Sequence, residues 1–99
     1  MGKFIIKIKD RYFEWSTIVD APVTYGMTLD ELKEYIKEEY GNEGLSGLPQ
    51  RLERVEKYGT SSHYHESVKQ LCSSNRAGEN EKHISLKQIY KQYGIPPEN

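Results

Sequence analysis

The feature that most restricts the fold is an alternation of apolar and charged residues near the start of the chain. Over residues 3–9, apolar side chains alternate with lysines, and only Ile5 interrupts the pattern. A period of two residues is that of a β-strand. Residues 12–19 are rich in the aromatic and β-branched residues that strands prefer. With a turn at Asp10-Arg11, the two segments predict a β-hairpin, which Ala21-Pro22 should end because proline cannot donate to a ladder.

The clearest helix pattern covers residues 28–40. Thr28 and Glu31 are spaced as in a capping box, in which a hydroxyl and a carboxylate bind free N–H groups of the first turn. The apolar residues recur at helical spacing on one face: Leu29, Leu32, Ile36 and Tyr40. Gly41 suits the end of this helix, and the glycines of residues 41–47 predict a loop.

Residues 51–58 fit two structures. Leu52 and Val55 are three residues apart, which suits a helix beginning at Pro49, but a short charged strand fits equally well. We favour the strand, because an isolated two-stranded hairpin is only marginally stable and a third strand would support it.

The last part of the chain predicts two helices, at residues 64–73 and 85–93. The second opens on a capping box of Ser85 and Gln88 and ends at Gly94. The whole pattern predicts a single domain, residues 1–99, of the α+β class with the order β-β-α-β-α-α. We expect a three-stranded antiparallel sheet of strand order 2-1-3, with the helices packed on one face.

Composition narrows the function. The chain has 99 residues, 35% of them hydrophobic, and a net charge of −1. Dedicated DNA- and RNA-binding proteins usually carry a basic excess, because phosphate neutralisation dominates their affinity, so dedicated nucleic-acid binding is not expected. Cys72 is the only cysteine, so no internal disulfide can form and a reducing cytoplasm is expected. The sequence shows no secretory pattern and no membrane-spanning apolar run, so no membrane partner is expected.

The first candidate binding segment is polar and precedes the predicted helix at 64–73. It consists of Thr60, Ser61, Ser62, His63, Tyr64 and His65. Hydroxyls and free N–H groups at the start of a helix can bind an anion. The alternative is that the hydroxyls are ordinary helix caps and the histidines are simply solvated.

The second candidate segment is the polar loop that follows the same helix. Its binding candidates are Asn75, Arg76, Gly78 and Asn80. Arginine suits bidentate recognition of phosphate, although an ordinary connector with Asn75 or Gly78 in a left-handed conformation would have the same composition. Tyr12 is a further binding candidate, which would stack on a ring of the ligand. Phe13 and Trp15 lie on the opposite strand face, which is expected to be buried, so Tyr12 should lie on the other face. Whether the two loops meet in one site stays open.

Metal and catalytic motifs are weak. His63, His65 and His83 are the only histidines, and a zinc site needs three or four ligands in fixed geometry. Cys72 lies in an apolar stripe and is expected in the core. We therefore expect no metal, no cofactor and a binding protein rather than an enzyme, with a small phosphodiesterase-type enzyme as the weakest alternative.

Four stretches resemble short uncharacterised proteins encoded by bacteriophages and prophages. The stretches are Phe4–Ser16, Asp20–Met27, Gly59–Ser61 and Asn75–Glu81. The resemblance implies a virus-encoded cytoplasmic protein of the host cell. Small phage accessory proteins often counter bacterial defence, either by sequestering nucleotide signals or by binding an effector protein. No activity is assigned to the similar proteins, so no site residues carry over.

The first hypothesis is a non-enzymatic binder of a phosphorylated small molecule, such as a nucleotide immune signal. Arg76 would pair with phosphate, the hydroxyls of residues 60–62 would surround it, and Tyr12 or Tyr64 would stack on a base. Such ligands often lie between subunits, so a homo-oligomer is expected. The second hypothesis is an anti-CRISPR-like inhibitor that binds a host defence protein. It would use the acidic side chains Asp30, Glu31, Glu34, Glu38 and Glu39, although interspersed lysines make an ordinary solvated face the alternative.

Overall fold

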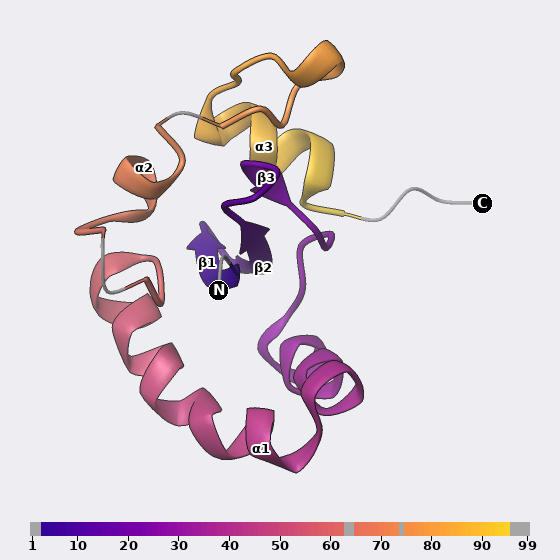
Figure 1. The fold of residues 1–99 in the computed structure, drawn as a ribbon, viewed down its shortest axis with the longest axis vertical. Helices are drawn as coiled ribbons and strands as arrows, with labels where there is room; N and C mark the ends of the chain where they lie inside the picture. Colours follow the sequence, from indigo (N-terminus) through magenta and orange to yellow (C-terminus); the bar gives the residue numbers. More distant parts are fainter. Residues whose placement is uncertain (1–2, 63–64, 74, 96–99) are drawn as a thin grey trace.

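A computed structural model describes residues 3–62, 65–73 and 75–95 (Figure 1). The elements are β1 (Lys3–Ile8), β2 (Arg11–Ser16), β3 (Ala21–Pro22), α1 (Leu29–Tyr58), α2 (Val68–Leu71), the 3₁₀ turn η1 (Glu79–Glu81) and α3 (Leu86–Tyr93). Within the described ranges, the strands form one antiparallel sheet in the order β1-β2-β3. The α+β class and the three-stranded antiparallel sheet are thereby confirmed.

The N-terminal hairpin forms as its alternation predicts. Phe4 pairs with Trp15 and Ile6 with Phe13, so these four apolar side chains share one face of the sheet. The opposite face carries Ile5, which breaks the alternation. Ile5 and Ile6 are both completely buried. The sheet is therefore covered on both sides at this point.

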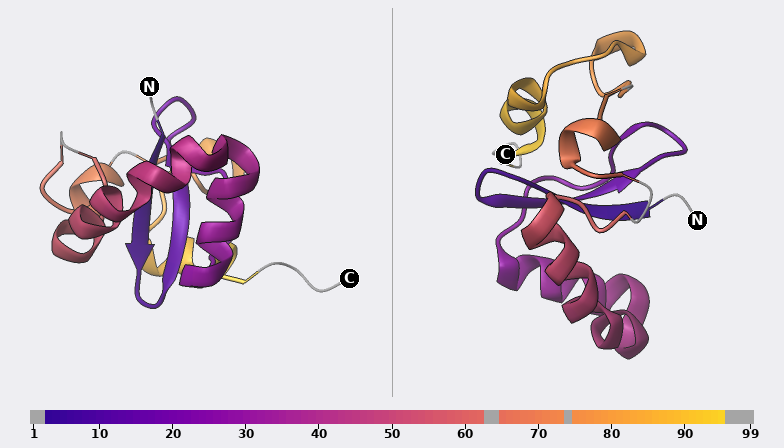
Figure 2. Two further views of the ribbon diagram at one scale, coloured as in Figure 1. Left: turned by 90° about the horizontal axis from the view of Figure 1, so that it is seen from below. Right: turned by 90° about the vertical axis from the view of Figure 1, so that its left-hand side faces the viewer.

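The helices accordingly pack on both faces of the sheet, and the expectation of a single covered face is wrong. In Figure 2, α1 lies on one side of the strands while α2 and α3 lie on the other. The core on the side of α1 consists of Ile5, Tyr12, Met27, Leu32, Ile36, Leu48 and Val55. The core on the other side consists of Ile6, Ile8, Phe13, Trp15, Leu71, Cys72, Ala77 and Ile89.

The predicted strand at residues 51–58 is also wrong, because α1 continues to Tyr58. Leu48, Leu52 and Val55 follow one another at helical spacing, and that spacing buries them against the sheet. The predicted loop at residues 41–47 is largely helical as well. Only Gly41 departs, with φ 67° and ψ −160°, and it kinks α1 into two segments (Figure 1).

The third strand is β3, so the predicted order 2-1-3 is not found. Ala21 and Pro22 pair with Ser16 and Trp15 at the far edge of β2. A proline is tolerated there because it has no backbone N–H to donate, and on the outer side of an edge strand no neighbouring strand needs that donor. The outer edge of β1 instead receives a single bridge between Ile6 and Thr60.

Of the two helices predicted in the last part of the chain, α3 is close to expectation and α2 is not. α3 is capped by Ser85, whose hydroxyl accepts from the Gln88 backbone N–H at 3.2 Å, as its capping pattern predicts. α2 is shorter than the predicted helix at 64–73 and begins after Ser67.

None of the helices in the described ranges has the length and apolar character needed to cross a bilayer.

Candidate functional site

The hydroxyls of the first predicted segment are used to hold the backbone. The Ser61 hydroxyl accepts from the Ile5 N–H at 2.9 Å, and the Thr60 hydroxyl accepts from the Ser62 N–H at 3.1 Å. Thr60, Ser61 and Ser62 are all buried. These contacts fasten the chain to the edge of β1 as it leaves α1. His63 and Tyr64 lie outside the described residues.

Ser62 and His65 form a pair whose distance invites a catalytic interpretation. The Ser62 Oγ lies 2.7 Å from the His65 Nδ1, which is within the range of a nucleophile and its general base. Ser62 is, however, 0% exposed, so a substrate has no route to its hydroxyl. The pair instead links the end of the segment that follows α1 to the segment that precedes α2.

Asn75 organises the second predicted segment from within. Its Nδ2 donates to the carbonyl oxygens of Cys72 at 2.9 Å and Ile84 at 2.7 Å. Its Oδ1 accepts from the N–H groups of Ala77 at 3.3 Å and Ile84 at 3.0 Å. These bonds use both donors and both lone pairs of the amide, so the Asn75 side chain is a structural group.

The remaining loop glycine and asparagine shape the backbone. At Gly78, an added Cβ would lie 2.7 Å from Ile84 Cγ2, so a larger residue does not fit. The left-handed conformation is adopted at Asn80, with φ 55°, and at Glu81, rather than at Asn75 or Gly78 as expected.

Arg76 is neutralised by nearby acidic side chains. Its guanidinium lies 3.4 Å from the Asp20 carboxylate and 3.8 Å from that of Glu81, and it donates to the Ile18 carbonyl at 3.2 Å. The Arg76 backbone N–H also donates to the Asp20 carbonyl. Arg76 therefore ties this loop to the turn between β2 and β3.

Tyr12 is only 7% exposed and packs beneath α1. Its hydroxyl donates to Glu56 at 3.4 Å, and the Lys7 ammonium lies 5.3 Å from its ring. The premise that the face of Tyr12 is open does not hold, because α1 covers it. The ring offers no open face to a base in this structure.

The two predicted segments lie at opposite edges of the sheet. Thr60 bridges to β1, while Arg76 contacts the turn that leads into β3, and β2 runs between them. The structure therefore does not bring the predicted residues into one cleft. Ser61 lines a hollow beside α1, whereas Asn75 lines a different hollow beside α3.

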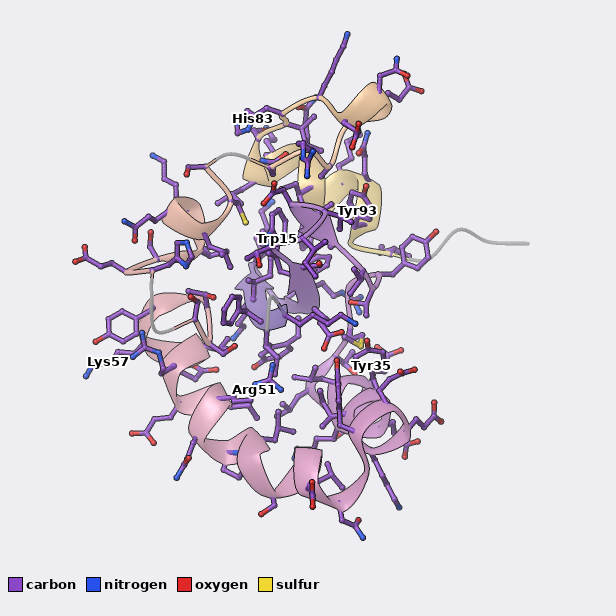
Figure 3. The ribbon with its side chains drawn as sticks, viewed as in Figure 1. Trp15, Tyr35, Arg51, Lys57, His83 and Tyr93 are labelled. Atoms are coloured by element: carbon purple, nitrogen blue, oxygen red, sulfur yellow. The ribbon has the colours of Figure 1, made fainter. Side chains whose placement is uncertain are left out.

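The hollow beside α1 is lined by several charged side chains, and we call it the α1 groove. Its volume is about 430 Å³. It is lined by Gly47, Gln50, Arg51, Glu53, Arg54, Lys57, Tyr58 and Ser61. Three cations thus face one carboxylate, in a chain whose net charge is −1. Arg51 and Lys57 are both carried by the C-terminal segment of α1 (Figure 3).

Arg54 is held in place within the α1 groove. Its guanidinium donates to the Ser62 carbonyl at 2.9 Å and lies 4.7 Å from the centre of the Tyr58 ring. The Lys57 ammonium lies 5.7 Å from the same ring. The Arg54 Nε is buried and has no hydrogen-bond acceptor among the described residues. The groove therefore contains an oriented guanidinium with one unsatisfied donor.

The signal for this groove was present in the sequence. Arg51, Arg54 and Tyr58 recur at intervals of three and four residues, which places them on one face of a helix. In a strand, Arg51 and Arg54 would point to opposite faces, so the wrong assignment of residues 51–58 hid the cluster.

A buried carboxylate lies between β2 and the N-terminal segment of α1. Glu14 is 1% exposed, and its two oxygens accept from the hydroxyls of Tyr35 and Tyr40, each at 2.7 Å. Burial, followed by the bond to Glu14, raises the pKa of Tyr40 to about 12, and the same causes raise the pKa of Tyr35 well above its usual range. Both tyrosines belong to the N-terminal segment of α1, which they fasten to β2.

Metal ligands do not gather in the part of the chain that the structure describes. There, no three side chains of His, Cys, Asp or Glu lie close enough to hold an ion.

Comparison with protein families, with curated proteins and with solved structures gives no match. The geometry of the α1 groove therefore carries the functional argument.

Proposed function

We propose that the protein is a non-enzymatic binder of a phosphorylated small molecule and that the α1 groove is its binding site. The observation that carries the proposal is the convergence of Arg51, Arg54 and Lys57 on one hollow. Its volume of about 430 Å³ suits a small organic ligand, since ligand pockets commonly measure about 300–1,000 Å³.

The two arginines supply the phosphate contacts in this proposal. A guanidinium presents a planar fork of N–H donors that matches phosphate oxygens, and Lys57 adds a point charge. Arg54 is already oriented by Ser62 and Tyr58, so it loses less side-chain freedom on binding. A phosphate oxygen would also provide the acceptor that the Arg54 Nε lacks after a small shift of the side chain.

Tyr58 and Ser61 supply the remaining contacts. Tyr58 lines the groove beside the cations and can contact a ring of the ligand. Ser61 lines the groove, and its hydroxyl also accepts from the Ile5 N–H. A ligand with both phosphate and an aromatic ring, such as a nucleotide, fits this combination best.

The resemblance to phage proteins supplies the biological setting of the proposal. A phage protein that holds a nucleotide without turning it over would lower the concentration of an immune signal in the host cytoplasm. Sequestration needs only binding, which agrees with a groove built from cations and an aromatic ring.

Calorimetry against a panel of ligands tests the proposal. The panel contains inorganic phosphate, cyclic dinucleotides and ADP-ribose derivatives. We expect at least one nucleotide to bind, and Arg51→Gln to weaken that binding by about tenfold or more, since hydrogen bonds to charged groups contribute about 1.5–3 kcal/mol. Arg76→Gln is the matched control, because Arg76 is paired with Asp20 outside the groove. Absence of heat with every nucleotide would contradict the proposal.

The second candidate function is inhibition of a host defence protein through the N-terminal segment of α1. Four glutamates are exposed there: Glu31, Glu34, Glu38 and Glu39. In the described part of the chain, the ion pair of this segment joins Glu31 to Arg11 at 3.9 Å, so the other three carboxylates are open to a basic partner. Capture of one stoichiometric host protein, lost on Glu34→Lys with Glu38→Lys, would favour this function over ligand binding.

A further inference from the structure

A second hollow lies on the other face of the sheet, between α2 and the start of α3. Its volume is about 520 Å³. It is lined by residues from α2, from the loop that Asn75 organises and from the first turn of α3. The α1 groove shares none of these residues, so the two hollows are separate.

The floor of the second hollow is apolar. It is formed by Cys72, Ile84 and Leu86. Ile84 and Leu86 pack against the core cluster that contains Cys72. Burial raises the pKa of the Cys72 thiol to about 12, so the thiol is neutral at physiological pH. The floor therefore favours an apolar group.

The rim of the second hollow is basic. Lys69, His83 and Lys87 line it, and no carboxylate among the described residues does so. Lys69 is carried by α2 and Lys87 by the first turn of α3, so the two ammonium groups come from different helices. The start of α3 adds the positive end of its helix dipole.

The floor of the hollow is held in shape by one buried side chain. Asn75 is 2% exposed, and it bonds to the Cys72 carbonyl and to both backbone groups of Ile84. These bonds fix the spacing of Cys72 and Ile84 before any ligand arrives. A preformed site loses less freedom on binding than a flexible one.

From this combination we infer that the hollow is a second binding site, which takes a small organic anion with an aromatic or aliphatic body. The body lies on Cys72, Ile84 and Leu86, and the anionic group meets Lys69 and Lys87 at the rim. The inference does not rest on the α1 groove, because it uses different residues and requires an apolar body as well as a charge.

Three probes separate the requirement for an apolar body from the requirement for a negative charge. Phenyl phosphate has both the ring and the charge, benzyl alcohol has the ring alone, and inorganic phosphate has the charge alone. Because the α1 groove is itself proposed to bind phosphate, the titrations use the variant Arg51→Gln with Lys57→Gln. Heteronuclear NMR follows the signals of Ile84, Leu86 and Lys87.

We expect phenyl phosphate to bind at least about tenfold more tightly than either partial probe, with saturable shifts at Ile84 and Leu86. Lys69→Gln with Lys87→Gln should weaken phenyl phosphate by about tenfold or more. Lys91→Gln, at the other end of α3, is the matched control and should leave binding unchanged.

Three results would overturn the inference. The first is equal binding of phenyl phosphate and inorganic phosphate, which would show an adventitious ion only. The second is equal weakening by Lys91→Gln and by the double substitution at the rim. The third is a set of shifts that leaves Ile84 and Leu86 unmoved.

Discussion

At the scale of single residues, polar side chains that resemble binding groups act as structural groups here. The sequence analysis proposed Thr60, Ser61 and Asn75 as binding residues. In the structure, the side chain of each accepts a hydrogen bond from a backbone N–H group that lies in a loop or in a distant strand. A sequence shows that a polar residue lies in a loop, but it does not show which distant N–H group will need an acceptor. Ile5 is 56 residues from Ser61 in the chain, and no local pattern predicts their bond.

The bonds of Asn75 predict a large effect on stability. Asn75→Ala would leave the backbone N–H of Ala77 and both backbone groups of Ile84 without partners, at a cost of about 1–3 kcal/mol for each unsatisfied group before local relaxation. We expect the free energy of unfolding in urea to fall by about 2–4 kcal/mol in total. Asn42→Ala, at an exposed position in α1, is the control and should change it by less than about 0.5 kcal/mol. Equal effects of the two substitutions would be incompatible with this role.

The contacts of Glu14 predict a loss of stability in alkali. The folded state raises the pKa of Tyr40 from the usual 10.0 to about 12 and raises that of Tyr35 too, so it holds both phenol protons more tightly than the unfolded chain. This contribution is complete below about pH 10 and is lost as the pH rises toward 12 and above. Tyr40 is partly exposed, so its share is reduced by solvent screening.

Urea unfolding between pH 8 and pH 12 measures this contribution. The parent protein should lose stability across the alkaline range more steeply than the variant Tyr35→Phe with Tyr40→Phe, which lacks the two phenol protons that bond to Glu14. Parallel profiles for the two proteins would show that the bonds to Glu14 do not have the assigned effect.

At the scale of elements, the predictable parts are those with strong local signals. The hairpin has its alternation, the start of α1 has the capping box of Thr28 and Glu31, and α3 has the cap of Ser85. The weak points were elements whose identity depends on tertiary contacts. Residues 51–58 fit either structure until the apolar side chains Leu52 and Val55 meet the sheet, and β3 is too short to leave a pattern.

Substitution by alanine should change the stability in opposite directions at two glycines of α1, Gly41 at the kink and Gly47 beyond it. Gly41 has φ 67° and ψ −160°, a conformation almost restricted to glycine, so Gly41→Ala should destabilise the protein by about 1–3 kcal/mol. Gly47 has no heavy atom within 4 Å of an added Cβ, so Gly47→Ala should stabilise the helix by about 0.5–1 kcal/mol. Thermal unfolding of the two variants gives the comparison. A stabilising Gly41→Ala would show that α1 straightens without penalty.

At the scale of the whole molecule, two small cores lie on either side of one sheet. This arrangement explains why a chain with only 35% hydrophobic residues can bury both faces of its hairpin. It also separates the two predicted loops, and it leaves Arg51, Arg54 and Lys57 together on the α1 groove. The expected homo-oligomer stays a prediction, which light scattering with and without a bound nucleotide can measure.

The central claim is that a phosphorylated ligand binds the α1 groove rather than the loop around Arg76. The most direct test is an NMR titration with the tightest nucleotide of the calorimetric panel. We predict the largest shifts at the signals of Arg51, Arg54, Tyr58 and Ser61, and their loss in Arg51→Gln with Lys57→Gln. Shifts confined to residues 75–81, or full binding by that double variant, would contradict the claim.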